Sequence, residues 1–246
     1  AIAGALIVAA TFIPPRRVAA QSEFTSPRNA DVDARGARAI RIDAAAGLLR
    51  VQGRPGINEV RVRGTAVASR RDWLEDIKLV AERRGNEVFI KAEIRENNRS
   101  GWRDWEDNRR GLDLIIEVPS NMALEVEDGS GEATFTSVGP LNLNDGSGSI
   151  DIRGAKGRVS IIDGSGEITL NGIEGDVTIE DGSGGIDARD ITGNFTISQD
   201  GSGSIAVDRV AGDFIVAHDG SGSIRYDTVK GRVSIPERQR RRRSDH

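Results

Sequence analysis

The chain has 246 residues and a formal net charge of −4, and it contains no cysteine, which excludes a disulfide framework and a thiolate metal site. Only 4% of the residues are aromatic and 37% are hydrophobic, which is little for a compact globular core. Thirty glycines against seven prolines indicate many tight turns within one elongated domain or two small domains.

The first segment has the features of a targeting sequence. Residues 1–13 form an apolar run that is shorter than the roughly 20 residues of a membrane-spanning helix. Small residues at Val18–Ala20 then suit a signal-peptidase site. We therefore expect 1–20 to be a signal peptide, 21–35 to be a flexible linker, and the protein to be exported to the periplasm or the cell surface of a bacterial envelope. An uncleaved membrane anchor is the alternative.

Residues 36–127 contain short runs in which apolar and polar residues alternate, and these runs predict an irregular, β-rich N-terminal part. Between two of the runs, Ser69–Val80 is a candidate short helix or extended insertion. The candidate strands are Ala39–Ile42, Leu48–Gln52, Glu59–Arg63, Glu87–Ile94 and Leu112–Val118.

A mixed-charge segment, residues 95–110 (RENNRSGWRDWEDNRR), interrupts this pattern. Loops inserted on a rigid scaffold often carry binding sites, and exposed tryptophans can stack on sugar rings or insert into a protein partner. The alternative is a flexible loop whose tryptophans cover a flank of the scaffold. The candidate recognition residues are Trp102, Arg103, Trp105, Arg109 and Arg110.

The tetrapeptide Asp-Gly-Ser-Gly (DGSG) recurs six times within residues 128–235. Successive copies are 17, 18, 18, 19 and 19 residues apart, and such a near-fixed period is typical of stacked structural repeats. The copies begin at Asp128, Asp145, Asp163, Asp181, Asp200 and Asp219.

Each repeat also contains two pairs of apolar residues at positions i and i+2, such as Ile150/Ile152 and Val159/Ile161. These pairs predict two short strands, each with one buried face. Equivalent corners of a parallel coil stack at roughly 4.8 Å per rung, which explains why every second corner has the same sequence. We therefore predict an all-β fold, a single-stranded parallel β-solenoid (β-helix) with about 18 residues per rung in 128–235, and 36–127 as its irregular N-terminal cap.

The DGSG corners have a structural interpretation, because the glycines supply positive φ values and the Asp and Ser side chains accept hydrogen bonds from turn amides. The alternative is a ladder of carboxylates that binds cations along one edge. In calcium-binding β-rolls each repeat places an aspartate ligand at a position that here holds Ala133, Ile150, Ile168, Ile186, Ile205 and Ile224. We favour the structural role for the six aspartates, and we expect neither a metal ion nor a cofactor.

Charge is distributed unevenly along the chain. Residues 128–235 carry 17 acidic and 8 basic side chains, which predicts an acidic rod. Residues 236–246 contain Pro236 and five arginines, and we expect a basic disordered tail that discourages strand pairing at the end of the solenoid. Contact of this tail with an anionic surface, and self-association through the solenoid ends, are alternatives. No nucleic-acid partner is expected.

Residue types used in catalysis are sparse. His218 and His246 are the only histidines, and there is no cysteine nucleophile and no Gly-rich phosphate loop. A polysaccharide-active enzyme is the alternative, with Asp151, Glu167 and Asp187 on successive copies of one strand as candidate carboxylates. Because the turns are short, we interpret these carboxylates as surface charges and the chain as not an enzyme.

The DGSG-x-Ile copies, the preceding segment LDLIIEVPSNMALEVEDGSG (residues 112–131) and the apolar N-terminus resemble a bacterial family of exported β-strand-repeat proteins described as putative adhesins. The resemblance covers residues 36–235 and implies the fold, but it transfers no catalytic or binding residues. We expect a non-catalytic adhesin or scaffold of the cell envelope, with an envelope polysaccharide or another envelope protein as its partner. A sensing or regulatory protein that binds through the Trp loop or the Arg tail is the alternative.

Overall fold

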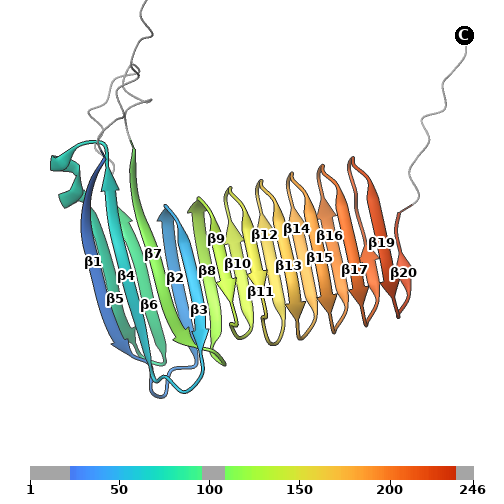
Figure 1. The fold of residues 1–246 in the computed structure, drawn as a ribbon, viewed down its shortest axis with the longest axis horizontal. Coiled ribbons are helices and arrows are strands. Elements are labelled where there is room, and N and C mark those ends of the chain that lie inside the picture. Colours follow the sequence, from blue (N-terminus) through green and yellow to red (C-terminus); the bar gives the residue numbers. More distant parts are fainter. Residues whose placement is uncertain (1–22, 96–108, 237–246) are drawn as a thin grey trace, which may run out of the picture.

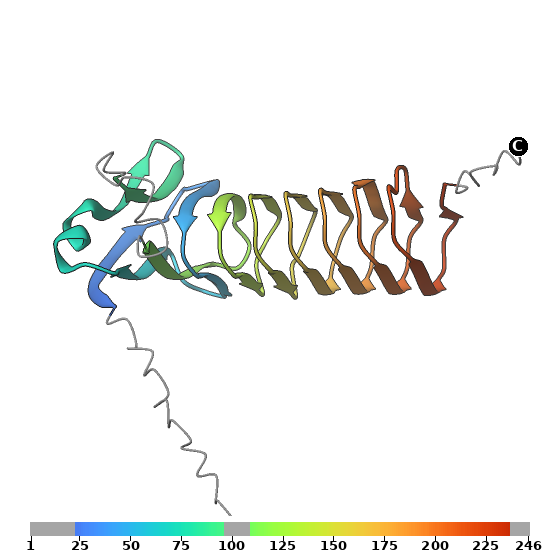
Figure 2. The same ribbon diagram turned by 90° about the horizontal axis from the view of Figure 1, so that it is seen from above.

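The computed structural model describes residues 23–95 and 109–236. Within these ranges the chain forms two ten-stranded sheets and one 3-10 helix, η1 (Arg71–Asp76). The two sheets face each other along an elongated molecule (Figures 1 and 2). No helix in this part of the chain is long and apolar enough to cross a membrane.

The strands divide into a longer N-terminal group and a shorter, regular group. The first group consists of β1 (Phe24–Asp33), β2 (Ala39–Ala46), β3 (Leu49–Arg54), β4 (Glu59–Ala68), β5 (Ile77–Arg84), β6 (Glu87–Ile94) and β7 (Arg110–Pro119). The second consists of β8 (Ala123–Ser130), β9 (Ala133–Thr136), β10 (Leu141–Asp145), β11 (Ile150–Arg153), β12 (Val159–Asp163), β13 (Ile168–Ile173), β14 (Val177–Asp181), β15 (Ile186–Ile191), β16 (Phe195–Asp200), β17 (Ile205–Val210), β18 (Phe214–Val216), β19 (Ile224–Val229) and β20 (Val233–Ser234).

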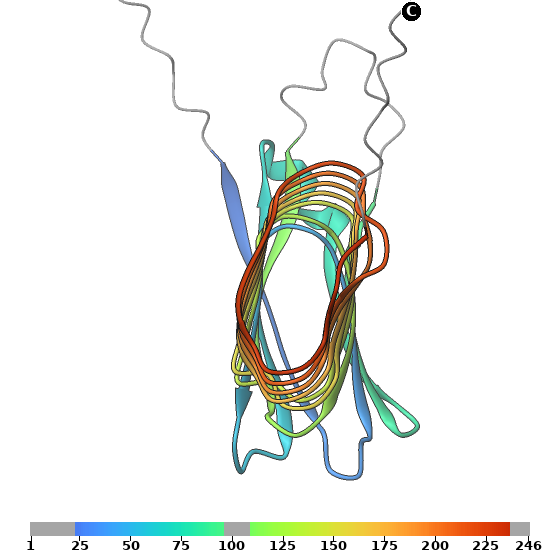
Figure 3. The ribbon, with the colours of Figure 1, turned by 90° about the vertical axis from the view of Figure 1, so that its right-hand side faces the viewer.

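From β8 onward the chain alternates between the two sheets, and each strand pairs in parallel with the strand two places further along the chain. Figure 3 looks along the stack and shows the successive turns lying over one another. We call one strand from each sheet, together with the corner between them, a rung. The chain is therefore all-β, with two open, mostly parallel sheets, and this arrangement is consistent with the predicted β-solenoid.

The core lies between the two sheets because inward and outward residues alternate along each short strand. In β10 the pattern places Leu141, Leu143 and Asp145 inside, and in β12 it places Val159, Ile161 and Asp163 inside. Parallel pairing then stacks like on like, for example Ile161 on Ile179. Burying one such side chain stabilises the fold by about 1.5–3 kcal/mol, and most of that burial is against the adjacent rungs.

The change in repeat length from 18 to 19 residues is accommodated by a β-bulge. Strand β16 shifts register against β14 between Ile179 and Glu180, so that Ser198 has no opposite residue. The Ser198 hydroxyl donates a hydrogen bond to the Ile179 carbonyl at 3.0 Å, which satisfies an acceptor that the bulge leaves beside the ladder. The aspartates on either side, Asp181 and Asp200, therefore remain opposite each other.

Both glycines of each DGSG corner lie where no side chain fits. A Cβ atom on Gly166 would lie 1.5 Å from the Gly148 carbonyl oxygen of the preceding rung, and Gly166 has a φ of +151°. The preceding glycine of the same corner, Gly164, lies similarly close to Gly146, with 2.4 Å between its Cβ position and that carbonyl oxygen. The corners stack so closely that glycine is required by space as well as by conformation.

The order of rungs along the molecule does not follow the order of the chain at the N-terminal end. Strand β2 lies between β6 and β8 in one sheet, and β3 lies between β7 and β9 in the other. The rung formed by β2 and β3 is therefore enclosed between the rung of β6 and β7 and the rung of β8 and β9. The connection 120–122 between β7 and β8 passes over this enclosed rung.

Antiparallel strands close the N-terminal end. Strands β1 and β4 extend one sheet beyond β7, and β5 extends the other beyond β6. The Arg28 guanidinium on β1 donates to the carbonyl oxygens of Ile77 and Leu74 at 2.9 and 2.7 Å, which ties the two sheets together. At the opposite end β19 and β20 are the last strands of the described residues, and Tyr226 on β19 is 51% exposed although it continues a buried column.

The N-terminal part differs from the sequence prediction in three places. Residues 24–33, expected to belong to a flexible linker, form β1, because they pair with β4 along their whole length. Residues 77–80, expected to belong to a short helix or extended insertion, form the first half of β5, and within 69–80 only Arg71–Asp76 is helical. The region expected to be irregular consists of regular strands, and it differs from 128–235 in its antiparallel pairs.

Candidate functional site

One hollow, with a volume of about 610 Å³, lies at the corner beside Arg109 and Arg110, at the start of β7. In the two adjacent rungs this corner is formed by residues 45–48 and by the first DGSG. We call it the corner hollow. Its lining residues are Glu23, Ala46, Gly47, Leu48, Val67, Arg109, Arg110, Gly111, Asp113, Ser130, Gly131 and Glu132.

Arg110 anchors the base of the inserted segment. Its guanidinium lies 4.1 Å from the centre of the Trp73 ring, and its Nη1 donates to the Arg95 carbonyl oxygen at 2.8 Å. Arg70 lies on the same ring system at 5.1 Å. A guanidinium on an indole face is stabilising by about 0.5–2 kcal/mol, depending on how well water is excluded.

Main-chain hydrogen bonds fix both ends of the same segment. The Arg95 amide donates to the Asp76 carbonyl oxygen at 3.0 Å, and the Ser69 amide donates to the Arg109 carbonyl oxygen at 3.0 Å. The Arg109 side chain forms an ion pair with Glu23 at 2.6 Å, but the arginine is 78% exposed, so this pair contributes little stability. Residues 95 and 109 are therefore held in place from η1 and β4.

The acidic side chains of the corner hollow have partners of their own. The Asp113 carboxylate accepts a hydrogen bond from the Leu48 amide at 2.9 Å. Glu132 lies 3.9 Å from Arg50. Within the described residues, the Nε of Arg110 is the one buried side-chain nitrogen of the lining without an acceptor. The hollow thus combines two cations and three carboxylates, Glu23 included, and most of this charge is compensated locally.

The structure describes two of the five predicted recognition residues. Arg109 and Arg110 lie together at the corner hollow, whereas Trp102, Arg103 and Trp105 lie outside the described residues. Trp73 contacts Arg110 but was not among the predicted residues, because its position arises from the packing of η1 against β1 and β4 and not from sequence spacing.

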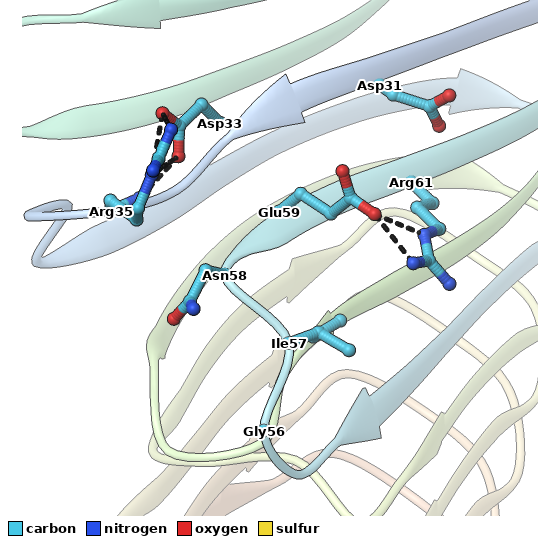
Figure 4. A pocket seen from close by; sticks show the side chains of 8 residues that line it. All are labelled: Asp31, Asp33, Arg35, Gly56, Ile57, Asn58, Glu59 and Arg61. Atoms are coloured by element: carbon cyan, nitrogen blue, oxygen red, sulfur yellow. Dashed lines mark hydrogen bonds and ion pairs between the residues drawn. The ribbon is translucent and has the colours of Figure 1, made fainter.

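A second hollow of about 420 Å³ lies at the opposite edge of the N-terminal part (Figure 4). Four of its five charged residues pair within the hollow, Arg35 with Asp33 at 2.7 Å and Arg61 with Glu59 at 2.6 Å. The fifth, Asp31, pairs with Arg63 outside it at 2.7 Å. The hydrogen bonds from Arg35 lower the pKa of Asp33 to about 2. Since these ion pairs use the charged groups, the hollow offers little unpaired charge to a ligand.

Five of the six DGSG aspartates are buried inside the coil, and Asp219 is half-buried. Asp128, Asp145, Asp163, Asp181 and Asp200 are between 0% and 6% exposed. The predicted turn hydrogen bond is present at two corners, where the amides of Ser165 and Ser183 donate to the aspartate two residues earlier at 3.1 and 3.0 Å. Both carboxylate oxygens of the buried Asp128, Asp145 and Asp200 have no hydrogen-bond partner among the described residues. The DGSG aspartate is thus a core residue as well as a turn residue.

The register of the strands separates the three carboxylates on which the enzymatic alternative depended. Asp151 is opposite Thr169, and Thr169 is opposite Asp187, so Glu167 is not in the same column. The two aspartates are two rungs apart, and each pairs with an arginine two residues later, Asp151 with Arg153 and Asp187 with Arg189. The carboxylate cluster that the enzyme reading required is therefore not formed by these three residues.

His218 is exposed at the corner before Asp219. Among residues 23–95 and 109–236, no group of three or more histidine, aspartate or glutamate side chains is placed to hold a metal ion.

Comparison with known proteins gives only distant likenesses. No protein-family model matches the sequence, and no curated protein matches it. A putative cell adhesion protein from Clostridium sporogenes is 13% identical, with 87% of this chain and 99% of that chain covered and a TM-score of 0.35. A putative adhesin from Bacteroides fragilis is 13% identical, with 87% and 98% covered and a TM-score of 0.43. A putative lipid binding protein from Parabacteroides distasonis is 13% identical, with 85% and 96% covered and a TM-score of 0.33.

These descriptions agree with the adhesin label of the family that the sequence resembles. At 13% identity and TM-scores below 0.5, the likenesses carry no argument about the function of this chain.

Proposed function

We propose that this chain is a non-catalytic adhesin or scaffold of the bacterial envelope, in which a rigid β-solenoid presents the segment 96–108 to an envelope polysaccharide or an envelope protein. The observation that carries the proposal is the clamping of this segment at both ends, at Arg95 and Arg109, on an otherwise regular stack of short corners. Binding residues are concentrated on insertions of this kind because the scaffold fixes where they start and end.

The contacts assign different tasks to the predicted recognition residues. Arg110 is engaged by Trp73 and the Arg95 carbonyl, and we therefore assign it a positioning role. Arg109 is mostly exposed and available to a partner once its ion pair with Glu23 opens. Trp102, Arg103 and Trp105 belong to the presented segment and are proposed to contact the partner directly. Export of the protein, with residues 1–20 removed, is part of this proposal.

The test is capture by the protein of envelope fractions and of isolated polysaccharides. One variant replaces residues 96–108 with Asp-Gly-Ser-Gly, the corner that the regular rungs use. A second, Trp102→Ala with Trp105→Ala, keeps the segment but removes its aromatic rings. The matched control is Arg225→Ala, which removes an exposed residue from the outer face of the last complete rung.

We expect the unaltered protein and the Arg225 control to retain one polysaccharide or one protein, and both segment variants to lose it. Retention of a polysaccharide identifies an adhesin of the cell wall, and retention of one protein identifies the sensing or regulatory alternative. Capture that is unchanged by both segment variants would remove the binding role from 96–108 and refute the proposal.

A further inference from the structure

The DGSG aspartates form one continuous column inside the coil. Asp145 is opposite both Asp128 and Asp163, and the same pairing continues through Asp181 and Asp200. A bridge between Asp200 and Asp219 extends the column to the last corner. Neighbouring rungs of a parallel sheet are roughly 4.8 Å apart, so each carboxyl group has the next one within reach.

The surroundings of this column do not neutralise it. The charged groups that act on Asp163 are Asp145 and Asp181, and those that act on Asp200 are Asp181 and Asp219. For Asp128 the acting charge is Asp145. Across the corner the facing strands β9, β11, β13, β15 and β17 contribute the buried apolar residues Ala133, Ile150, Ile168, Ile186 and Ile205. The charged groups that act on these three aspartates are therefore aspartate carboxyls of neighbouring rungs.

A fully ionised column is unfavourable in this position. Burying a carboxylate without a counter-ion or hydrogen bonds costs several kcal/mol, and a like charge one rung away adds to that cost. Eight buried carboxylate oxygens of Asp128, Asp145, Asp163, Asp181 and Asp200 have no hydrogen-bond partner among the described residues, and they cannot all remain acceptors without a donor. A proton on every second carboxyl relieves both problems, because the protonated group donates its O–H to the ionised neighbour.

We propose that the interior aspartate column is a proton-binding site of the coil, which is filled in mild acid, shared between neighbouring carboxyls near neutral pH, and emptied in alkali with loosening of the rungs. The proton is its ligand, and the column couples the tightness of the stack to the pH outside the cell. This inference does not depend on the proposed binding role of 96–108.

The direction of the coupling follows from the pKa values. Burial, reinforced by neighbouring carboxyls, raises the pKa of Asp128 to about 7 and those of Asp163 and Asp200 to about 6, and burial also raises the pKa values of Asp145 and Asp181. The folded chain therefore binds protons more tightly than the unfolded chain, in which aspartate has a pKa of about 3.9. Stability from this source is complete below about pH 4 and is lost as the pH rises through 6–7.

The test compares thermal unfolding of three proteins at pH 5 and pH 8: the full chain, the variant Asp145→Asn/Asp163→Asn/Asp181→Asn, and a control. The control, Glu125→Gln/Glu167→Gln/Glu180→Gln, removes three exposed carboxylates from neighbouring positions of the same repeats. We expect the midpoint of the full chain and of the control to fall by about 5–10 °C from pH 5 to pH 8. The Asn variant should lose most of this fall and exceed the full chain at pH 8.

Infrared spectroscopy of the unaltered chain provides a second readout that does not depend on a folded variant. We expect the C=O stretch of protonated carboxyl groups in the folded protein at pH 6, its disappearance by pH 9, and its absence from the unfolded chain at pH 6. A folded chain without this band at pH 6 would overturn the proposal. So would an Asn variant whose pH dependence equals that of the full chain.

Discussion

Glycine at the last position of each DGSG corner is the residue on which the stack depends most directly, and Gly166→Ala tests this. A Cβ atom at this position would lie 1.5 Å from the Gly148 carbonyl oxygen and 2.6 Å from the carbonyl carbon. Both of these atoms are backbone, so no side chain can rotate away to make room. Relief requires the two rungs to separate by well over 1 Å.

The expected loss is the sum of two effects. Separation of the rungs breaks the hydrogen bonds from the Gly148 amide to Ser165 and from the Ile150 amide to Glu167, which are 2.9 and 2.8 Å long. Two such bonds contribute about 1 kcal/mol each. A side chain at a φ of +151° adds about 1–2 kcal/mol of backbone strain. We therefore expect Gly166→Ala to reduce the free energy of unfolding by about 3–4 kcal/mol, before any loss of packing.

The control is Gly185→Ala, one repeat further along. A Cβ atom there meets nothing closer than the Ser204 carbonyl oxygen at 3.9 Å, and the residue has no positive φ. We expect this substitution to be neutral or stabilising by up to about 1 kcal/mol. The assay is urea unfolding followed by far-ultraviolet circular dichroism. If the two variants unfold within about 1 kcal/mol of each other, the close approach of the corners is not what selects glycine.

Three further outcomes follow from the contacts. Thr228→Gly should stabilise the last rung by about 1 kcal/mol, because Thr228 has a φ of +50° at the position where earlier rungs have Gly154 and Gly172. The control, Thr169→Gly, changes a residue on a strand and should destabilise the protein in the same urea assay. Phe214→Ala should reduce the free energy of unfolding by about 3–5 kcal/mol, since the buried Phe214 ring stacks on Phe195 at 5.7 Å. Hydrogen exchange should then show that amide protection is lost in β16–β20 but kept in β8–β12. Trp73→Ala should release Arg110 and speed trypsin cleavage at Arg109 and Arg110, whereas Trp73→Phe, which keeps an aromatic face, should preserve most of the resistance.

The regular half of the fold could be predicted because one sequence signal determines several structural features at once. The DGSG spacing fixes the corner, the corner fixes the register, and the register places Ile161 on Ile179. Even the change from 18 to 19 residues leaves the aspartates opposite each other, because the extra residue, Ser198, is accommodated in a bulge. Strand boundaries in this half follow from apolar residues at i and i+2.

The rule that charged residues lie on the outside does not predict that the DGSG aspartates point into the coil. Asp145 is two positions after Leu143, so the period of two already places it on the inner face. Asp145 keeps this inner position because the parallel pairing of its strand extends to it, opposite Asp128 and Asp163. Five of the 17 acidic residues of 128–235 are buried in this inner column, so 12 acidic and 8 basic residues are left for the rest of the region, and its outer surface is less acidic than composition suggested.

The N-terminal part could not be predicted because its neighbours in space are not its neighbours in sequence. No local pattern in β2 and β3 indicates that they insert between β6–β7 and β8–β9, since each strand has the same alternation as the rungs that follow. The closing strands have a cause that becomes visible only in three dimensions. An open coil end exposes strand edges to further pairing, and β1 blocks this with Pro27 and with Arg28, whose guanidinium bonds to carbonyls across the end. Among the described residues, no strand lies beyond β19 and β20 and Tyr226 is exposed, so any addition of strands to the stack is expected at that end.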